Sequence, residues 1–172
     1  RNRHGWLLCM EGARMAAARK IVFASSGGTI YGQADESDLP LKESQPQRPL
    51  SPYGIAKKAF TDYLNAYREL YEIEYTSLAL ANIYGPRQDP HGEAGVVAIF
   101  CNRILTRQPL TVFGDGLQTR DYVFVKDVAR ANLAAATRTL PAPARLDARG
   151  FNIGTGVETS VVDLAAALRR SA

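Results

Sequence analysis

Long apolar runs, a cysteine framework and dense clusters of one charge are all missing from this sequence of 172 residues. No apolar stretch approaches the ~18 residues that a membrane-spanning helix needs, so we expect no membrane partner. Cys9 and Cys101, the two cysteines, lie in apolar periodic stretches. This pattern predicts buried thiols in a reducing compartment rather than disulfides, and the cytoplasm is therefore the expected location.

The distribution of charge argues against a nucleic-acid partner. The net charge is +4, but the basic residues are scattered, and the densest cluster is only Arg169 and Arg170. A nucleic-acid-binding protein usually concentrates its basic residues on one face or along one helix. The sequence favours a mildly basic surface, and we expect no nucleic-acid partner.

The first half of the chain alternates between helical and strand-like patterns. Apolar residues with helical spacing cover about 7–17, and the apolar run 21–24 is typical of a strand buried on both faces of a parallel sheet. A polar, proline-containing loop is predicted over 32–51, then a helix over 52–71 that begins with proline. A second buried strand is predicted over 75–81. This order indicates a parallel sheet with crossover helices.

The second half of the chain predicts shorter elements. A stretch rich in proline and alanine indicates a linker near its end. No internal repeat is present. The patterns predict helices over 96–105, over 128–136 and from Val161, strands over 110–113, 121–124 and 151–153, and the linker over 140–148.

Tyr53 and Lys57 form a possible proton-transfer pair. They stand four residues apart at the start of the helix predicted over 52–71, so both side chains project from one face. A tyrosine with its ordinary pKa of about 10 is a poor base at neutral pH, and a nearby ammonium favours the phenolate. A Tyr-x-x-x-Lys pair also arises by chance in many surface helices, so the pair alone does not decide between the two interpretations.

Ser25 and Ser26 strengthen the catalytic interpretation because they end the preceding strand. The carboxyl edge of an open α/β sheet is where such sheets bind ligands. A hydroxyl there, beside Tyr53 and Lys57, would complete a proton relay around a carbinol, which hydride transfer to or from a sugar hydroxyl requires. For either serine alone, simple turn chemistry remains the better explanation.

Five segments together resemble the NAD-dependent epimerase/dehydratase family, a group of extended short-chain dehydrogenases/reductases. They occur in the family's order and at its spacing, and they cover essentially the whole chain. The double glycine after the serines is similar to the UDP-glucose 4-epimerase branch. The segments are IVFASSGGTIYG (21–32), SPYGIAK (51–57), NIYGPRQ (82–88), RDYVFVKDV (120–128) and FNIGTG (151–156).

The resemblance implies an α/β fold, namely the second half of a Rossmann-type doubly wound parallel sheet plus part of a smaller α/β substrate-binding domain. Residues 1–85 would belong to the dinucleotide-binding domain. Residues 86–172 would form mainly the substrate domain, with about 115–136 returning to the Rossmann sheet. No Gly-x-x-Gly-x-x-Gly loop precedes the serines. That loop binds the dinucleotide pyrophosphate, so we expect it upstream of residue 1, and a further segment after residue 172.

The implied activity is NAD-dependent epimerisation of a UDP-hexose by a full-length homodimer, without a metal. Hydride would leave C4 of the sugar and return to its other face through a 4-keto intermediate. Tyr53 would act as base and acid, Lys57 would tune it and hold the nicotinamide ribose, and Ser26 would relay the proton. The resemblance places Tyr53, Lys57, Ser25, Ala81 and Asn2 at the cofactor, and Ser26, Thr29, Tyr53, Asn82, Phe113, Arg120 and Tyr122 at the substrate.

The identity of the relay hydroxyl stays open. Counting back from Tyr31 puts Gly27 in the place of the catalytic hydroxyl, and Thr29 then becomes the alternative to Ser26. Another departure from the family is Trp6, which stands where a small polar residue is usual.

Alternative functions follow from the same segments. Nucleotide-sugar 4,6-dehydratases and decarboxylases need a carboxyl group just after the hydroxyl, and residues 27–29 are Gly, Gly and Thr, which favours epimerisation. An inactive fragment or a non-catalytic binding relative is the alternative from another class, although the intact Ser, Tyr and Lys argue against a degenerate site. Arg120 and Asp121 could equally form a surface ion pair.

Overall fold

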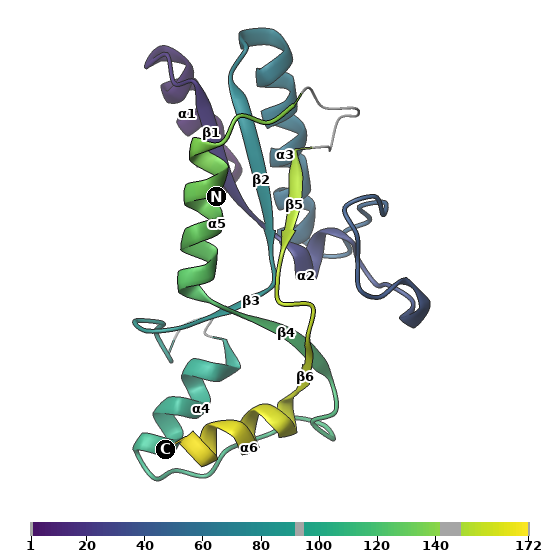
Figure 1. The fold of residues 1–172 in the computed structure, drawn as a ribbon, viewed down its shortest axis with the longest axis vertical. Helices are drawn as coiled ribbons and strands as arrows, with labels where there is room; N and C mark the ends of the chain where they lie inside the picture. Colours follow the sequence, from purple (N-terminus) through teal and green to yellow (C-terminus); the bar gives the residue numbers. More distant parts are fainter. Residues whose placement is uncertain (1, 92–94, 142–148, 172) are drawn as a thin grey trace. The chain divides into compact units, whose positions relative to one another are not determined.

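The computed structural model of this chain describes residues 2–91, 95–141 and 149–171. The chain divides into two compact units (Figure 1). Unit 1 comprises Arg1–Leu80 and Arg130–Ile153, and unit 2 comprises Ala81–Ala129 and Gly154–Ala172. Among the described helices, none has the length and apolar character needed to cross a membrane.

Unit 1 is built on a three-stranded sheet of order β1-β2-β5, in which both strand pairs are parallel. Ser25 pairs with Ala79 and Leu80 pairs with Ile153, so the three strands end at a common carboxyl edge. The parallel arrangement expected from the sequence is therefore present. The elements of unit 1 are α1 (Asn2–Met15), β1 (Lys20–Ser26), α2 (Gly27–Ile30), η1 (Glu36–Asp38), α3 (Pro52–Tyr71), β2 (Glu74–Leu80) and β5 (Gly150–Ile153).

Helix α3 has clear signals at both ends. Ser51 is its N-cap, and the Ser51 hydroxyl accepts a hydrogen bond from the Gly54 N–H at 3.0 Å. Pro52 occupies the first helical position, where a missing N–H is harmless. Glu72 ends the helix in the left-handed conformation, with φ of 57°, and its N–H donates to the Arg68 carbonyl. The bounds predicted from the sequence are confirmed.

The core of unit 1 lies between the sheet and helices α1 and α3. Three aromatic rings from different elements meet there, with the Phe23 and Phe60 centroids 4.5 Å apart and the Trp6 and Phe60 centroids 5.0 Å apart. Burial of each large apolar side chain contributes roughly 1.5–3 kcal/mol. The fully buried members of this cluster are Met10, Phe23, Phe60, Leu64 and Tyr75.

Two expectations about burial were wrong. Strand β1 is not buried on both faces, because it lies at one end of the described sheet and its residues alternate between faces: Phe23 is buried, whereas Ala24 is exposed. Cys9 is exposed and Cys101 is only partly buried. In α1 the inward face is occupied by Trp6 and Met10, one turn apart, which leaves Cys9 on the outside.

Unit 2 contains a mixed three-stranded sheet of order β3-β4-β6, with β3 parallel and β6 antiparallel to β4. Its two helices α4 and α6 pack through Phe100, Val161 and Ala165. Strands β3 and β6 were not predicted, because three residues are too few to show a period. The elements are β3 (Asn82–Tyr84), α4 (Val96–Leu105), β4 (Thr119–Phe124), α5 (Val125–Thr137, which continues into unit 1), β6 (Glu158–Ser160) and α6 (Val161–Ser171).

The strand predicted over 110–113 is wrong. Leu110 and Val112 are apolar because they pack against the cluster of α4 and α6, not because they join a sheet. Gly114 and Gly116 then take positive φ and turn the chain towards β4. Helix α5 also begins three residues earlier than predicted, and most of the predicted linker, 142–148, lies outside the described residues.

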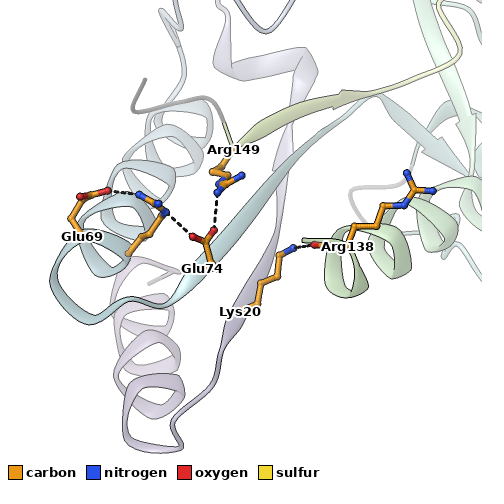
Figure 2. A network of polar contacts seen from close by, with 6 residues as sticks. Lys20, Glu69, Glu74, Arg138 and Arg149 are labelled. Atoms are coloured by element: carbon orange, nitrogen blue, oxygen red, sulfur yellow. Dashed lines mark hydrogen bonds and ion pairs between the residues drawn. The ribbon is translucent and has the colours of Figure 1, made fainter. Parts of the chain in front are cut away.

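Polar contacts gather at the starts of the strands in unit 1, at the edge opposite the serines (Figure 2). The Glu74 carboxylate lies 3.2 Å from Arg149 Nη2 and accepts from Arg68 Nε at 2.9 Å. Arg149 is only 3% exposed. Lys20 Nζ donates to the Arg138 carbonyl at 2.9 Å. The buried guanidinium therefore depends on Glu74 for its compensating charge.

Replacing Glu74 with glutamine should destabilise the protein by about 2 kcal/mol. Breaking a fully buried ion pair costs about 3–5 kcal/mol, and the 41% exposure of the Glu74 side chain reduces that loss through solvent screening. Urea denaturation measures the change. Glu69→Gln is the matched control, because Glu69 is 61% exposed and pairs with Arg68, so it should cost no more than about 0.5 kcal/mol. Equal losses in the two variants would contradict the role given to Glu74.

Candidate active site

Tyr53 and Lys57 lie one turn apart at the start of α3, as predicted. Gly54 lets this turn approach the end of the serine strand, because a Cβ at position 54 would lie 2.6 Å from the Thr29 carbonyl oxygen and 3.0 Å from Pro49 Cβ. The first turn of α3 thus packs directly on α2, which follows Ser26. The Tyr53 side chain remains 50% exposed at this edge, so its phenol is open to a substrate.

The ammonium of the partly buried Lys57 contacts one carbonyl and three aromatic rings at this edge. Nζ donates to the Ala24 carbonyl at 2.6 Å. It lies 4.9 Å from the Phe23 ring centroid, 5.2 Å from that of Trp6 and 5.5 Å from that of Tyr53, all within cation–π range. Desolvation lowers the pKa of Lys57 from its usual value. An ammonium carries three donors, so one bond to Ala24 leaves capacity for a ligand hydroxyl.

Because successive side chains of β1 point to opposite faces of the sheet, Ser25 and Ser26 lie on different faces. Ser25 shares the face of Phe23 and is 5% exposed, and its hydroxyl has no hydrogen-bond partner among the described residues. Ser26 lies on the opposite face with Ala24 and is partly exposed. The Thr29 hydroxyl donates to the Ser26 carbonyl at 3.5 Å, so both candidate relay residues belong to the same turn.

Gly27 occupies a crowded position in that turn. A Cβ there would lie 3.1 Å from the Ala79 carbonyl oxygen and 3.3 Å from that of Leu80, so a side chain would press against the end of β2. A Cβ at Gly28 would meet nothing within 4 Å. The end of β2 therefore leaves little room for a side chain at position 27.

In unit 2, three of the predicted substrate residues share one face of the β3–β4 pair. Asn82 pairs with Tyr122 in the register, and Arg120 lies two residues before Tyr122 on the same strand. The Tyr122 hydroxyl is buried and has no partner in the described part of the chain. Desolvation raises the pKa of Tyr122, and the charge of Arg120 opposes that rise. Arg120 is exposed, and a guanidinium there suits a phosphate, which it can bind in a fork.

Phe113, Ala81 and Asn2 complete the predicted set. Phe113 lies before a turn with its ring 82% exposed, and Ala81 is partly buried between β2 and β3. Asn2 begins α1, but the structure does not describe its side chain. Asn2 belongs to unit 1 with the Tyr53–Lys57 pair, whereas Ala81 and Phe113 belong to unit 2 with Arg120.

Asp121 is the residue whose role the sequence analysis missed. Its carboxylate accepts from the Thr155 N–H at 2.9 Å, the Thr155 hydroxyl at 2.7 Å and the Gly156 N–H at 2.9 Å. A Cβ at Gly154 would lie 2.3 Å from the same carboxylate. Asp121 therefore organises the turn before β6, while Arg120 donates to the Thr119 carbonyl. The Gly-Thr-Gly segment after β5 was the available signal of a tight polar turn.

The sequence profile of the NAD dependent epimerase/dehydratase family matches residues 1–154. The chain belongs to this family. The α/β fold with a parallel sheet that the resemblance implied is confirmed by solved structures of related epimerases.

Three relatives show how much of their length this chain covers. UDP-glucose 4-epimerase of Mycolicibacterium smegmatis is 49% identical, over 95% of this chain and 50% of the relative. The Thermotoga maritima UDP-glucose 4-epimerase, solved with UDP-glucose, matches with a TM-score of 0.89 and 44% identity, over 96% of this chain and 51% of that one. The Thermus thermophilus UDP-glucose 4-epimerase, solved with NAD, matches with a TM-score of 0.85 and 40% identity, over 97% and 52%. The chain thus spans about half the length of these relatives.

Proposed function

We propose that this family member is part of an NAD-dependent UDP-glucose 4-epimerase that interconverts UDP-glucose and UDP-galactose. The observation that carries the proposal is the exposed Tyr53 side chain beside the partly buried ammonium of Lys57, at the carboxyl edge of a parallel sheet. The 49% identity to a protein named UDP-glucose 4-epimerase supports the same substrate.

The chemistry needs a group that takes a proton from the 4-hydroxyl of the sugar and later returns it. Tyr53 is that group, and the Lys57 ammonium lies 5.5 Å from the centroid of its ring. Ser26 passes the proton between the phenol and the sugar oxygen. When bound, NAD supplies the acceptor and donor of hydride at C4.

The residues of unit 1 fit a dinucleotide. The Lys57 ammonium can donate to a ribose hydroxyl while it keeps its bond to Ala24. The buried hydroxyl of Ser25 lacks a partner among the described residues and could be satisfied from the cofactor side. We therefore assign unit 1 to the dinucleotide-binding half of the enzyme.

The residues of unit 2 fit the nucleotide-sugar. Arg120 would bind the diphosphate, and the unpartnered Tyr122 hydroxyl, with the neighbouring Asn82, would bind the remaining polar groups of the substrate. In unit 1, residues 27–29 offer no carboxyl group for a second proton transfer, which favours epimerisation over 4,6-dehydration.

The test is an assay of the full-length protein with UDP-galactose and NAD. The expected result is formation of UDP-glucose, which is measured with a coupling enzyme that oxidises UDP-glucose. Nucleotide-sugar chromatography distinguishes the alternatives. Release of a 4-keto-6-deoxy sugar would identify a dehydratase, and absence of any turnover with NAD present would contradict the proposed activity.

The homodimer expected from the sequence is a further proposal, supported by the outer face of α1 and α3. Apolar side chains recur there every seven or eight residues: Leu8 and Met15 on α1, and Ile55, Tyr63 and Leu70 on α3, are 47–80% exposed. Exposed apolar stripes of this kind mark interfaces, and a twofold dimer would pack the stripe against its own copy. The cytoplasmic location also stays a prediction.

Tyr63→Arg should convert the dimer into a monomer, because it places an unpaired charge at the centre of this stripe. Light scattering coupled to size-exclusion chromatography gives the molar mass. The control is Val157→Arg, at a residue 61% exposed in unit 2, which should leave the mass unchanged. A dimer that persists in Tyr63→Arg would place the interface elsewhere.

A further inference from the structure

Trp6 is one of three aromatic residues that surround the Lys57 ammonium, a group that we call the Lys57 cage. Unlike the other two, it lies on an element that carries neither a proposed catalytic residue nor one of the two serines. The Lys57 cage consists of Trp6 from α1, Phe23 from β1 and Tyr53 from α3, with the Ala24 carbonyl as acceptor. The structure assigns Trp6 a function in this cage. We propose that Trp6 is a positioning residue that holds the Lys57 ammonium beside Tyr53. This inference rests on the proposed function in one respect, namely that Tyr53 is the catalytic partner of Lys57.

The position of the Trp6 indole is fixed by the core. Its ring meets Phe23 edge-on, with centroids 5.5 Å apart, and packs on Phe60 at 5.0 Å. Phe23 and Phe60 are themselves buried. The indole therefore presents a fixed face to the ammonium, and indole is the aromatic group that attracts cations most strongly. The long apolar stem of Lys57 can lie along the same rings while its charged end reaches the sheet edge.

The chemistry of the cage explains why aromatic groups suit this position. Burial lowers the pKa of Lys57, and the shift has desolvation as its single cause, without a charged side chain among the described residues contributing. Tyr53 is the titratable group that faces the ammonium, whereas α1 and β1 face it with rings and a carbonyl. A carboxylate would also hold the ammonium, but it would cancel the positive charge that the phenolate needs. Aromatic faces attract the cation and leave its charge available to Tyr53.

The first experiment measures the effect of the cage on the pKa of Lys57 and does not depend on catalysis. Competitive acetylation of the full-length protein with acetic anhydride, read by mass spectrometry over a range of pH, gives the pKa of each lysine. Trp6→Leu removes the aromatic face and should lower the pKa of Lys57 by about 0.4 to 1.5 units, because a cation–π contact contributes roughly 0.5–2 kcal/mol. Trp6→Phe keeps a weaker ring and should give a smaller shift in the same direction.

Two controls separate the cage from general packing. Phe60→Leu removes a ring that touches both Trp6 and Phe23 but keeps the indole, so it should shift the pKa of Lys57 less than Trp6→Leu does. Lys58, which pairs with Asp62 at 3.0 Å, should label alike in every variant. An unshifted Lys57 in Trp6→Leu, or an equal shift in Phe60→Leu, overturns the proposal. If Trp6→Leu does not fold, the absence of a shift in Trp6→Phe overturns it.

The second experiment asks whether positioning matters for turnover. Trp6→Leu should lower kcat about threefold to tenfold with KM for UDP-galactose unchanged, because the proposed effect of the indole acts through Lys57. Trp6→Phe should restore most of the rate, and Phe60→Leu should keep kcat near that of the parent enzyme. A shifted Lys57 with unaltered kcat would overturn the catalytic part of the proposal. Failure of all variants and the parent to turn over would count against the proposed function, while the labelling result would still decide the role of Trp6.

Discussion

Tyr53→Phe should lower the turnover of the full-length enzyme by at least about a hundredfold and leave binding of the nucleotide-sugar nearly unchanged. Proton transfer by a positioned side chain is worth about 10²–10⁴ in rate. The phenol acts on the proton that is transferred in the transition state, whereas the diphosphate contacts that we assign to unit 2 are intact in the variant. Phenylalanine also keeps the ring that faces the Lys57 ammonium, so the cage should persist.

The comparison with Tyr63→Phe makes this prediction specific. Tyr63 is on the same helix and is 47% exposed, close to the 50% of Tyr53, but it lies outside the Lys57 cage. Initial rates with UDP-galactose give kcat and KM, and calorimetric titration with UDP gives the affinity of the nucleotide site. Near-normal turnover in Tyr53→Phe, or an equal loss in Tyr63→Phe, would remove Tyr53 from its catalytic assignment.

Local signals made the elements that carry the Tyr53–Lys57 pair predictable. The Ser51 cap and Pro52 define the start of α3 within the sequence itself, and the apolar runs of β1 and β2 give a parallel pair once crossover helices separate them. Where a signal was weak or ambiguous, the prediction failed. Strands β3 and β6 have only three residues each. The run 110–113 is apolar because its residues pack against helices, and it does not join a sheet.

The remaining features of the site depend on contacts between residues that are distant in the sequence. The partners of Asp121 lie 34 and 35 residues away, so no local pattern could reveal that its carboxylate organises the turn at Thr155 and Gly156. The contact between Trp6 and Lys57 likewise exists only because α1 and α3 pack on the same face of the sheet. The sequence predicted the reacting groups, and tertiary packing supplied the groups that hold them.

The burial of the two serines was also beyond sequence reasoning, because it depends on which face of β1 is covered. Helices α1 and α3 cover the face of Phe23, so Ser25 is enclosed and Ser26 emerges on the other face at the strand end. Ser26 is therefore the more accessible of the two hydroxyls. The enclosed Ser25 suits a contact that is made from within the edge of the sheet.

Ser26→Ala should therefore cost about 2–4 kcal/mol of transition-state stabilisation in the full-length enzyme, by analogy with the loss of one positioned hydrogen-bond donor. That corresponds to a loss of roughly 30-fold to 1,000-fold in kcat/KM. Thr29→Ala should cost clearly less, because the Thr29 hydroxyl is turned towards the Ser26 carbonyl. Ser26→Thr keeps a hydroxyl at the same place and should recover part of the rate.

Kinetics of the three variants, measured with UDP-galactose at saturating NAD, decide between the two hydroxyls. A larger loss in Thr29→Ala than in Ser26→Ala would exchange the roles of the two hydroxyls. Equal, small losses in both would mean that the phenol of Tyr53 meets the sugar oxygen directly. The crowding of a side chain at Gly27 by the carbonyls of Ala79 and Leu80 leaves these two residues as the hydroxyl-bearing candidates of the turn.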